Sequence, residues 1–193
     1  MNIRTKKGFT INLAGKAAPQ VGDCPLAETF AIKPADFVGL SRPKSVRKVG
    51  EIVKAGDALF FDKKMPNVKY TAPVSGELVE IERGAKRKIL AYKILADKEI
   101  QYREFKVHTL SQLAKLNKED VLEPMLESGV WLNLIQRPYG VVANPEDKPK
   151  AIFISSFDSS PLAPSYDITL KDQKHYLQAG IDILKKVTNC PIH

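Results

Sequence analysis

The most constraining feature of the chain is a regular succession of short apolar segments and tight turns between residues 46 and 95. Each segment has the length of a strand, and apolar and polar side chains alternate cleanly over residues 77–81. The expected strands cover residues 51–53, 58–61, 68–71, 77–81 and 88–95. The turns between them are rich in Gly, Pro and Lys, and we expect positive φ at Gly56 and Gly76. Short strands at this spacing predict a compact β-sandwich or barrel.

The residues before this region also favour a β domain. Residues 9–13 alternate Phe, Ile and Leu with polar residues, which predicts a half-buried strand. Prolines exclude a long helix from the next stretch, where residues 29–32 and 37–40 predict brief strands. We therefore expect one β domain over residues 1–103.

After residue 102 the apolar period changes to that of helices. Residues 110–116 and 121–126 fit helical spacing, and Gly129 is typical of a helix stop. A loop rich in Pro and Gly follows, and the continuous apolar run over residues 151–154 predicts a strand that is buried on both faces.

A last helix is expected from about Thr169, where Thr169 and Asp172 resemble a capping box. Its apolar stripe would consist of Leu170, Leu177, Ile181, Leu184 and Val187. A strand, a loop and a helix require a parallel partner strand, and the sequence ends where that strand would begin. This predicts an incomplete, Rossmann-like α/β segment over residues 104–193, cut inside its domain.

Composition excludes several classes of protein. No run approaches the roughly 20 apolar residues that cross a bilayer, so we expect a soluble chain. Cys24 and Cys190 are predicted to be ordinary thiols, and the isolated histidines predict no metal site. No nucleophile can be paired with a base, so no catalytic residue is expected. The formal net charge of +8 invites an acidic partner, but the basic residues lack the interleaved aromatics of a single-strand binder, so nucleic acid is not expected.

Residues 53–61 and 72–81 resemble the two halves of a biotinyl/lipoyl-type domain, a barrel-sandwich hybrid. In carrier domains of that type the intervening hairpin presents a modified lysine, so a swinging-arm carrier that uses Lys63 or Lys64 is one alternative function. The hairpin lacks the Met-Lys-Met or Asp-Lys-Ala surroundings that the modifying ligases expect. A pair of solvated turn lysines is the simpler interpretation.

A closer resemblance extends over most of the chain. The segments that carry it are residues 7–8, 13–15, 57–64, 72–76, 83–87 and 129–139. Together they resemble the A subunit of the bacterial Na⁺-translocating NADH:quinone reductase. The resemblance implies a peripheral component on the cytoplasmic face of the bacterial inner membrane, in a complex that passes electrons from NADH to quinone and exports sodium. Its partners would be integral membrane and flavin-bearing subunits, which hold the flavins and iron–sulfur of the complex.

Relatives of that family in respiratory complex I and Rnf-type complexes bind flavin through a glycine-rich loop. A phosphate at a helix N-terminus needs closely spaced glycines, and this chain has no Gly-x-Gly-x-x-Gly. At the corresponding position, residues 130–139 carry bulky side chains. We therefore predict that this chain holds no cofactor, and we keep a flavin-binding, Rnf-type electron-transfer subunit as the second alternative.

Two sets of residues are candidate contacts. Trp131, Arg137 and Tyr139 offer an aromatic wall and a cation, which suit a quinone head group or a partner protein, although core packing and a salt bridge are the alternatives. The basic residues proposed to dock on acidic protein or anionic lipid are Lys63, Lys64, Arg83, Lys86 and Arg87.

Overall fold

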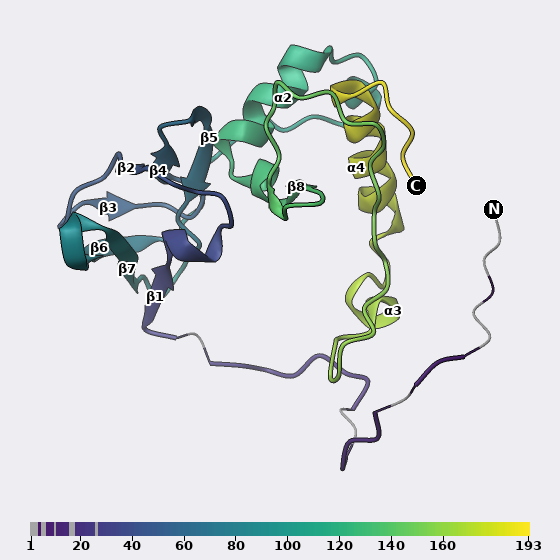
Figure 1. Cartoon of the computed structure of the whole chain (residues 1–193), viewed down its shortest axis with the longest axis horizontal. Coiled ribbons are helices and arrows are strands. Elements are labelled where there is room, and N and C mark those ends of the chain that lie inside the picture. The colour runs from purple at the N-terminus through teal and green to yellow at the C-terminus, as the bar shows by residue number, and fades with distance from the viewer. Residues whose placement is uncertain (1–3, 5–6, 10, 16–17, 26) are drawn as a thin grey trace.

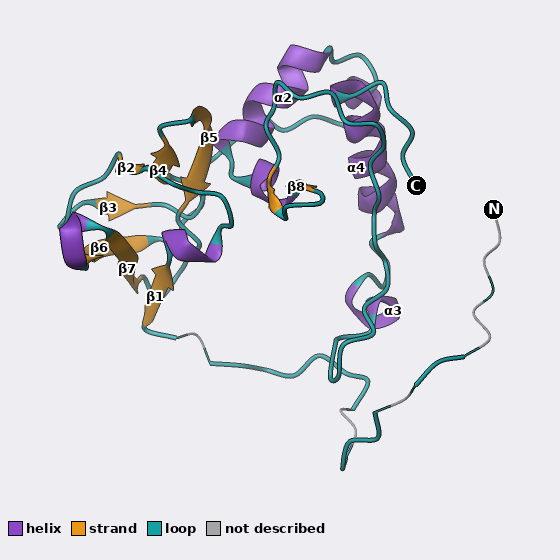
Figure 2. Ribbon diagram, viewed as in Figure 1, coloured by secondary structure: helices purple, strands orange, loops and turns teal. Residues whose placement is uncertain are grey.

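The alternating region folds into two antiparallel sheets that face each other (Figures 1 and 2). The structure is a computed structural model that describes residues 4, 7–9, 11–15, 18–25 and 27–193. The strands of the two sheets are β1 (Thr29–Ile32), β2 (Pro43–Ser45), β3 (Ile52–Val53), β4 (Ala58–Asp62), β5 (Met65–Thr71), β6 (Gly76–Arg83) and β7 (Ile89–Ala96). Their order is β1-β7-β6-β3 in one sheet and β2-β4-β5 in the other, which confirms the predicted barrel-sandwich fold. We call this part the barrel.

A stack of aromatic rings fills the barrel between its sheets. Phe60 of β4 stacks on Tyr70 of β5, with centroids 4.7 Å apart, and on Tyr92 of β7 at 4.8 Å. Phe37 meets the edge of Tyr70, also at 4.7 Å. Each such pair contributes about 0.5–1.5 kcal/mol beyond the burial of its area. Because Phe60 and Tyr92 come from different sheets, the stack binds the two sheets to each other.

The glycine turns behave as expected. Gly56 has φ +94° and Gly76 has φ +146°, values that residues other than glycine rarely adopt. A Cβ at Gly76 would also collide with the carbonyl oxygen of Leu95 across the β6–β7 pair. The β4–β5 turn is tighter than predicted, because β4 runs to Asp62 and β5 begins at Met65.

Two expected strands near the N-terminus are wrong. Phe9 is 99% exposed and residues 11–13 are irregular, while Thr10 lies outside the described residues. Residues 37–40 form a turn in which Gly39 has φ +87°, after a short 3₁₀ helix, η1 (Pro34–Asp36). Alternation marks a face that a strand could bury, but a strand forms only where a neighbour supplies its hydrogen bonds.

The α/β segment after residue 103 contains helices and one small hairpin. Their bounds are α1 (Leu110–Leu113), α2 (Lys118–Glu127), η3 (Val130–Asn133), β8 (Ile135–Gln136), β9 (Val141–Val142), α3 (Tyr166–Thr169) and α4 (Lys174–Val187). Capping boxes begin α1 at Thr109 and α2 at Asn117. Gly129 has φ +79° and ends the helical run, as predicted. The expected loop covers residues 137–149, so β9 lies inside it while β8 directly precedes it.

The buried strand over residues 151–154 is wrong in extent. Ile152 forms an isolated parallel bridge with Ile192, Ile154 N donates to His193 O at 2.8 Å, and Phe153 is 79% exposed. In this bridge Ile152 N donates a hydrogen bond to Pro191 O at 2.9 Å, and His193 N donates one to Ile152 O at 2.8 Å. The parallel contact lies where the sequence pattern places the start of a partner strand, but no further strand pairs with residues 151–154 among the described residues. A run of apolar residues cannot become a buried strand without sheet neighbours on both sides.

The capping box at Thr169 is also wrong. Thr169 ends α3, and α4 begins at Lys174. Asp172 has φ +61°, a left-handed conformation that a helix cannot contain. The apolar stripe is therefore split, because Leu170 precedes α4 while Leu177, Ile181, Leu184 and Val187 lie within it.

The hydroxyl of Tyr92 is a polar group inside the apolar core of the barrel. It is buried and has no hydrogen-bond partner among the described residues. Burial raises the pKa of Tyr92 above its usual value; the nearby Ser45 hydroxyl, which makes no hydrogen bond with it, and the charge of Arg83 oppose the rise. An unpaired buried hydroxyl costs about 1–3 kcal/mol. We expect Tyr92→Phe, which keeps the ring stack, to leave the free energy of unfolding in urea unchanged or raise it by about 1 kcal/mol.

Phe60→Ala is the control, because it removes the central ring of the same stack and should lower the free energy of unfolding by about 3–5 kcal/mol. A loss above about 1 kcal/mol in Tyr92→Phe would mean that the hydroxyl makes a stabilising bond.

Candidate functional site

The linker between the barrel and the α/β segment lies along the barrel wall. Tyr102 forms an isolated parallel bridge with Ala55; Gln101 O accepts from Ala55 N at 2.9 Å, and Arg103 N donates to Ala55 O at 2.8 Å. The buried hydroxyl of Ser75 accepts from Gln101 N at 2.8 Å and donates to Asp97 Oδ2 at 2.6 Å. One serine thus fastens both ends of the connection, and the linker is an extension of the barrel.

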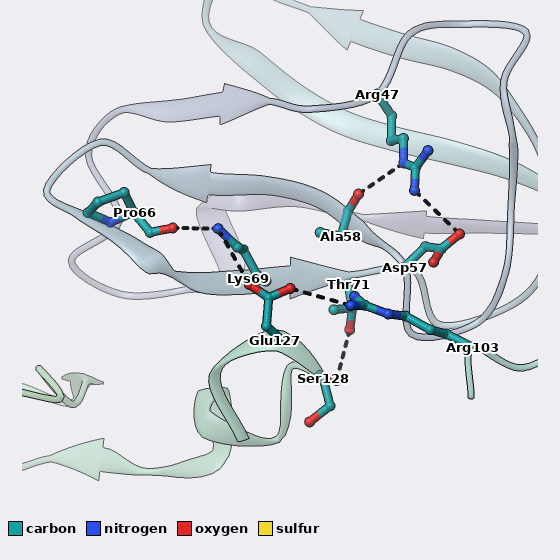
Figure 3. A network of polar contacts seen from close by, with 9 residues as sticks. All are labelled: Arg47, Asp57, Ala58, Pro66, Lys69, Thr71, Arg103, Glu127 and Ser128. Carbon is teal, nitrogen blue, oxygen red and sulfur yellow. Dashed lines mark hydrogen bonds and ion pairs between the residues drawn. The ribbon is translucent and has the colours of Figure 1, made fainter. Parts of the chain in front are cut away.

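The last turn of α2 is fastened to the barrel by Glu127 (Figure 3). Its carboxylate lies 3.8 Å from Lys69 Nζ of β5 and 3.5 Å from Arg103 Nη2 of the linker. Lys69 also donates to Pro66 O at 2.7 Å, which holds it in place. Partly exposed pairs of this kind contribute about 0–1 kcal/mol each, so they orient the contact more than they stabilise it.

Two glycines bring the backbones of the two parts together. Gly129, at the end of α2, faces Thr71 of β5, and a Cβ there would lie 2.5 Å from Thr71 Oγ1. The Thr71 hydroxyl donates a long hydrogen bond, 3.5 Å, to Ser128 O (Figure 3). On the barrel side, a Cβ at Gly39 would lie 2.6 Å from Cγ1 of Val141 in β9. We call this contact region, with the Glu127 pairs, the junction.

The structure separates the three predicted quinone or partner contacts. Trp131 lies in η3, is 4% exposed and donates from Nε1 to Ala143 O at 2.7 Å. Arg137 and Tyr139 lie in the β8–β9 turn and are exposed, Tyr139 to 77%. The indole belongs to the same apolar cluster as the barrel core. A contact with quinone or a partner remains a prediction for all three, and the exposed pair is better placed for it.

An apolar cavity that the sequence did not reveal lies between α2, η3, α4 and residues 152–155. Its volume is about 810 Å³. Its lining includes Phe105, Met125, Leu134, Phe153, Tyr176 and Ile181. The sequence signal that could have pointed to it was the apolar run at residues 151–154, which the structure places along the cavity wall instead of in a sheet.

The lysine pair sits at the tip of the β4–β5 hairpin. Lys63 and Lys64 are exposed, and the buried Asp62 shapes the turn by accepting from Ser41 N at 3.0 Å and Lys64 N at 3.1 Å. Burial, and then the charge of Asp62, raise the pKa of Tyr70 to about 12. With its pKa raised, the Tyr70 hydroxyl stays protonated at physiological pH. The turn is held by the Asp62 carboxylate, which accepts its hydrogen bonds beneath the two exposed lysines.

The second basic set surrounds η2 (Ala85–Arg87), the turn between β6 and β7. Arg83, Lys86 and Arg87 are all exposed. Figure 1 shows this turn at the end of the barrel remote from α2 and α4. The two predicted docking sets are therefore carried by different hairpins of the barrel.

The described residues offer few other chemical groups. Among them, no three His, Cys, Asp or Glu side chains converge as metal ligands. Cys24 and Cys190 are both free thiols. In the same part of the chain, no helix combines the length and the apolar character that a membrane span requires.

Comparison with known families agrees with this two-part architecture. The family model described as the NqrA N-terminal barrel-sandwich hybrid domain matches residues 3–97, and the model described as the NqrA second alpha/beta domain matches residues 116–193. The fold is thus a barrel-sandwich hybrid followed by an α/β domain, in the order that this family uses.

Curated relatives extend the match over nearly the whole chain. The A subunit of the Na(+)-translocating NADH-quinone reductase of Serratia proteamaculans (strain 568) is 35% identical over 196 residues, which cover 99% of this chain and 42% of the relative. The A subunits of Vibrio vulnificus (strain YJ016) and Neisseria gonorrhoeae (strain NCCP11945) are each 35% identical, over 96% and 99% of this chain and 41% and 42% of their own lengths. The chain belongs to the NqrA family, the A subunits of Na⁺-translocating NADH-quinone reductases, and spans about two fifths of the length of these relatives.

The junction glycines can be tested with a matched control. Gly129→Ala should lower the free energy of unfolding by about 2–4 kcal/mol, because it adds a contact with Thr71 to the strain of a positive φ. Gly140 has φ +68° with no atom within 4 Å, so Gly140→Ala carries the φ strain alone and should lose about 1 kcal/mol. Urea denaturation measures both. Equal losses in the two variants would contradict the close approach at the junction.

Proposed function

We propose that this chain acts within a Na⁺-translocating NADH:quinone oxidoreductase as a peripheral, cofactor-free docking unit on the cytoplasmic face of the bacterial inner membrane. The observation that carries the proposal is the 35% identity to the A subunits over 96–99% of the chain, through both domains. NADH, flavins, iron–sulfur and quinone chemistry would belong to other subunits, integral membrane and flavin-bearing ones among them.

The side chains at residues 129–139 support the absence of a cofactor site. A nucleotide phosphate needs an open approach to backbone amides, which closely spaced glycines provide. Here the backbone after Gly129 continues into η3, and the indole of Trp131 is packed under the β8–β9 hairpin with its N–H bonded to Ala143 O. The space beside this backbone is therefore occupied by an ordered aromatic side chain.

Arg137 and Tyr139 are proposed to contact quinone or a neighbouring protein of the complex. Both lie at the exposed β8–β9 turn, where a cation and an aromatic ring stand on the same short hairpin. A guanidinium suits the developing oxyanion of a quinone head group, and a phenol ring offers a stacking face. Trp131 would act beneath them, by holding η3 and β9 together.

The junction supports a role in docking. The linker is hydrogen-bonded to the barrel wall, Glu127 pairs with both the barrel and the linker, and the apolar cluster is continuous across the contact. A partner bound to the barrel would therefore also fix the position of the α/β segment. Lys63, Lys64, Arg83, Lys86 and Arg87 are proposed as contacts with acidic protein or anionic lipid.

The carrier alternative rests on the position of Lys63 and Lys64 at a hairpin tip. Lys64 borders a small pocket of about 110 Å³ with Asn144, Pro145 and Glu146, so the tip faces a neighbouring loop and is not isolated in solvent. Intact mass of protein from the native host decides this point, because a biotinyl or lipoyl adduct would add a defined mass.

Affinity purification of the tagged, full-length protein from its host membranes tests the main proposal. We expect integral membrane and flavin-bearing subunits to be recovered with it, while the isolated chain, incubated with flavin mononucleotide and desalted, should show no flavin absorbance. Recovery in a biotin- or lipoate-dependent complex would replace the proposal. Retained flavin would overturn the cofactor-free part alone.

A further inference from the structure

The turn between β6 and β7 carries unusual backbone strain. Lys86 has φ 54° and ψ 31°, and the next residue, Arg87, has φ 61°. A two-residue hairpin turn requires this left-handed conformation at both central positions, and Gly, Asn or Asp usually occupy them, so Lys and Arg hold it here at a cost. Such strain persists only where surrounding structure enforces it, and it tends to lie at functional positions.

The surrounding structure enforces it through the hairpin. Gly84 N donates to Lys88 O at 2.8 Å and Lys88 N donates to Ala85 O at 3.2 Å, which closes the turn at its base. Arg83 Nη1 reaches Arg87 O at 3.4 Å. The strands on either side pair from Gly76 opposite Ala96 to Arg83 opposite Ile89, with register shifts between Leu78 and Glu80 and between Glu82 and Arg83. The backbone positions of Lys86 and Arg87 are therefore fixed by the turn and by the flanking ladder.

The charges on this turn are not neutralised by carboxylates of the described residues. Arg83, Lys86, Arg87 and Lys88 are exposed, and no ion pair involves any of them within that part of the chain. On the same hairpin, Lys93 lies 3.0 Å from both Glu80 and Glu82. The hairpin thus neutralises one cation in its sheet and holds four others at its tip, at the end of the barrel remote from the helices (Figure 1).

We propose that this basic turn, residues 83–88, is the anchor by which the barrel binds an acidic protein surface, a cluster of carboxylates on a folded neighbouring protein of the complex. The proposal rests on the proposed function and narrows its docking surface to one turn and one class of partner. A turn whose backbone is already fixed loses little ordering entropy on binding, and it gains most from this against a partner whose carboxylates are also fixed. Fluid lipid head groups rearrange around any cation, so a strained turn would add nothing to binding a membrane.

Because the turn is strained, substitutions there can change stability and docking independently of each other. Lys86→Gly and Arg87→Gly relieve the left-handed strain and should each raise the melting temperature by about 1–3 °C. Lys86→Gln and Arg87→Gln keep the strain, so they should leave the melting temperature unchanged. The Gly variants and the Gln variants both remove the charges, so both should weaken docking. A loss of docking can therefore be told apart from a loss of stability.

The binding probe is the host's membrane complex from which this component has been stripped, to which full-length protein is re-bound. We expect Lys86→Gln/Arg87→Gln to weaken re-binding about tenfold or more, with a steeper loss at high salt. Lys148→Gln/Lys150→Gln, an equal loss of charge on an exposed loop outside the proposed contacts, should weaken re-binding by less than about threefold.

The possible outcomes are distinguishable. Failure of the unaltered protein to re-bind would sink the proposed function together with the anchor. Unaltered protein that binds while the turn variant binds equally well would overturn the anchor alone. Equal charge-dependent binding to protein-free vesicles of phosphatidylcholine and phosphatidylglycerol would replace the acidic protein with lipid and also overturn it.

Discussion

The ring stack through Phe60 is the interaction on which the rest of the structure depends. Phe60 contacts Tyr70 in its own sheet and Tyr92 in the opposite one, so the barrel closes around three aromatic rings. The sheets are short, and their hydrogen bonds alone would leave them free to slide. The stack fixes the separation of the two sheets, and thereby positions the hairpins that carry the exposed lysines and arginines.

A few close contacts attach the linker and the α/β segment to this core. The linker is bonded to Ala55 and Ser75, and the junction relies on two glycines, Gly39 and Gly129, one from each part. Glycine allows backbones to approach where a Cβ would push them apart. The ion pairs of Glu127 then select one orientation. Docking on the barrel and positioning of the α/β segment are consequently parts of one mechanical unit.

Residues 46–95 were predicted well because their strands are neighbours in sequence and pair through short turns. The alternating pattern and the turn glycines are local signals, and they agree with the tertiary contacts. The errors came where the partner was distant or absent. Residues 9–13 and 151–154 have the apolar pattern of strands, but among the described residues neither lies between strands that could supply a ladder, and Asp172 ends what looked like one continuous helix.

The sequence alone determined the barrel-sandwich class, the stop at Gly129 and the kinship with the A subunits, because these depend on residue types at short spacing. Only the tertiary structure decided that Trp131 is buried while Tyr139 is exposed, that Glu127 meets Lys69 and Arg103, and that Lys86 and Arg87 are strained. Burial, ion pairing and backbone strain are imposed by neighbours far along the chain. A local pattern therefore cannot encode them.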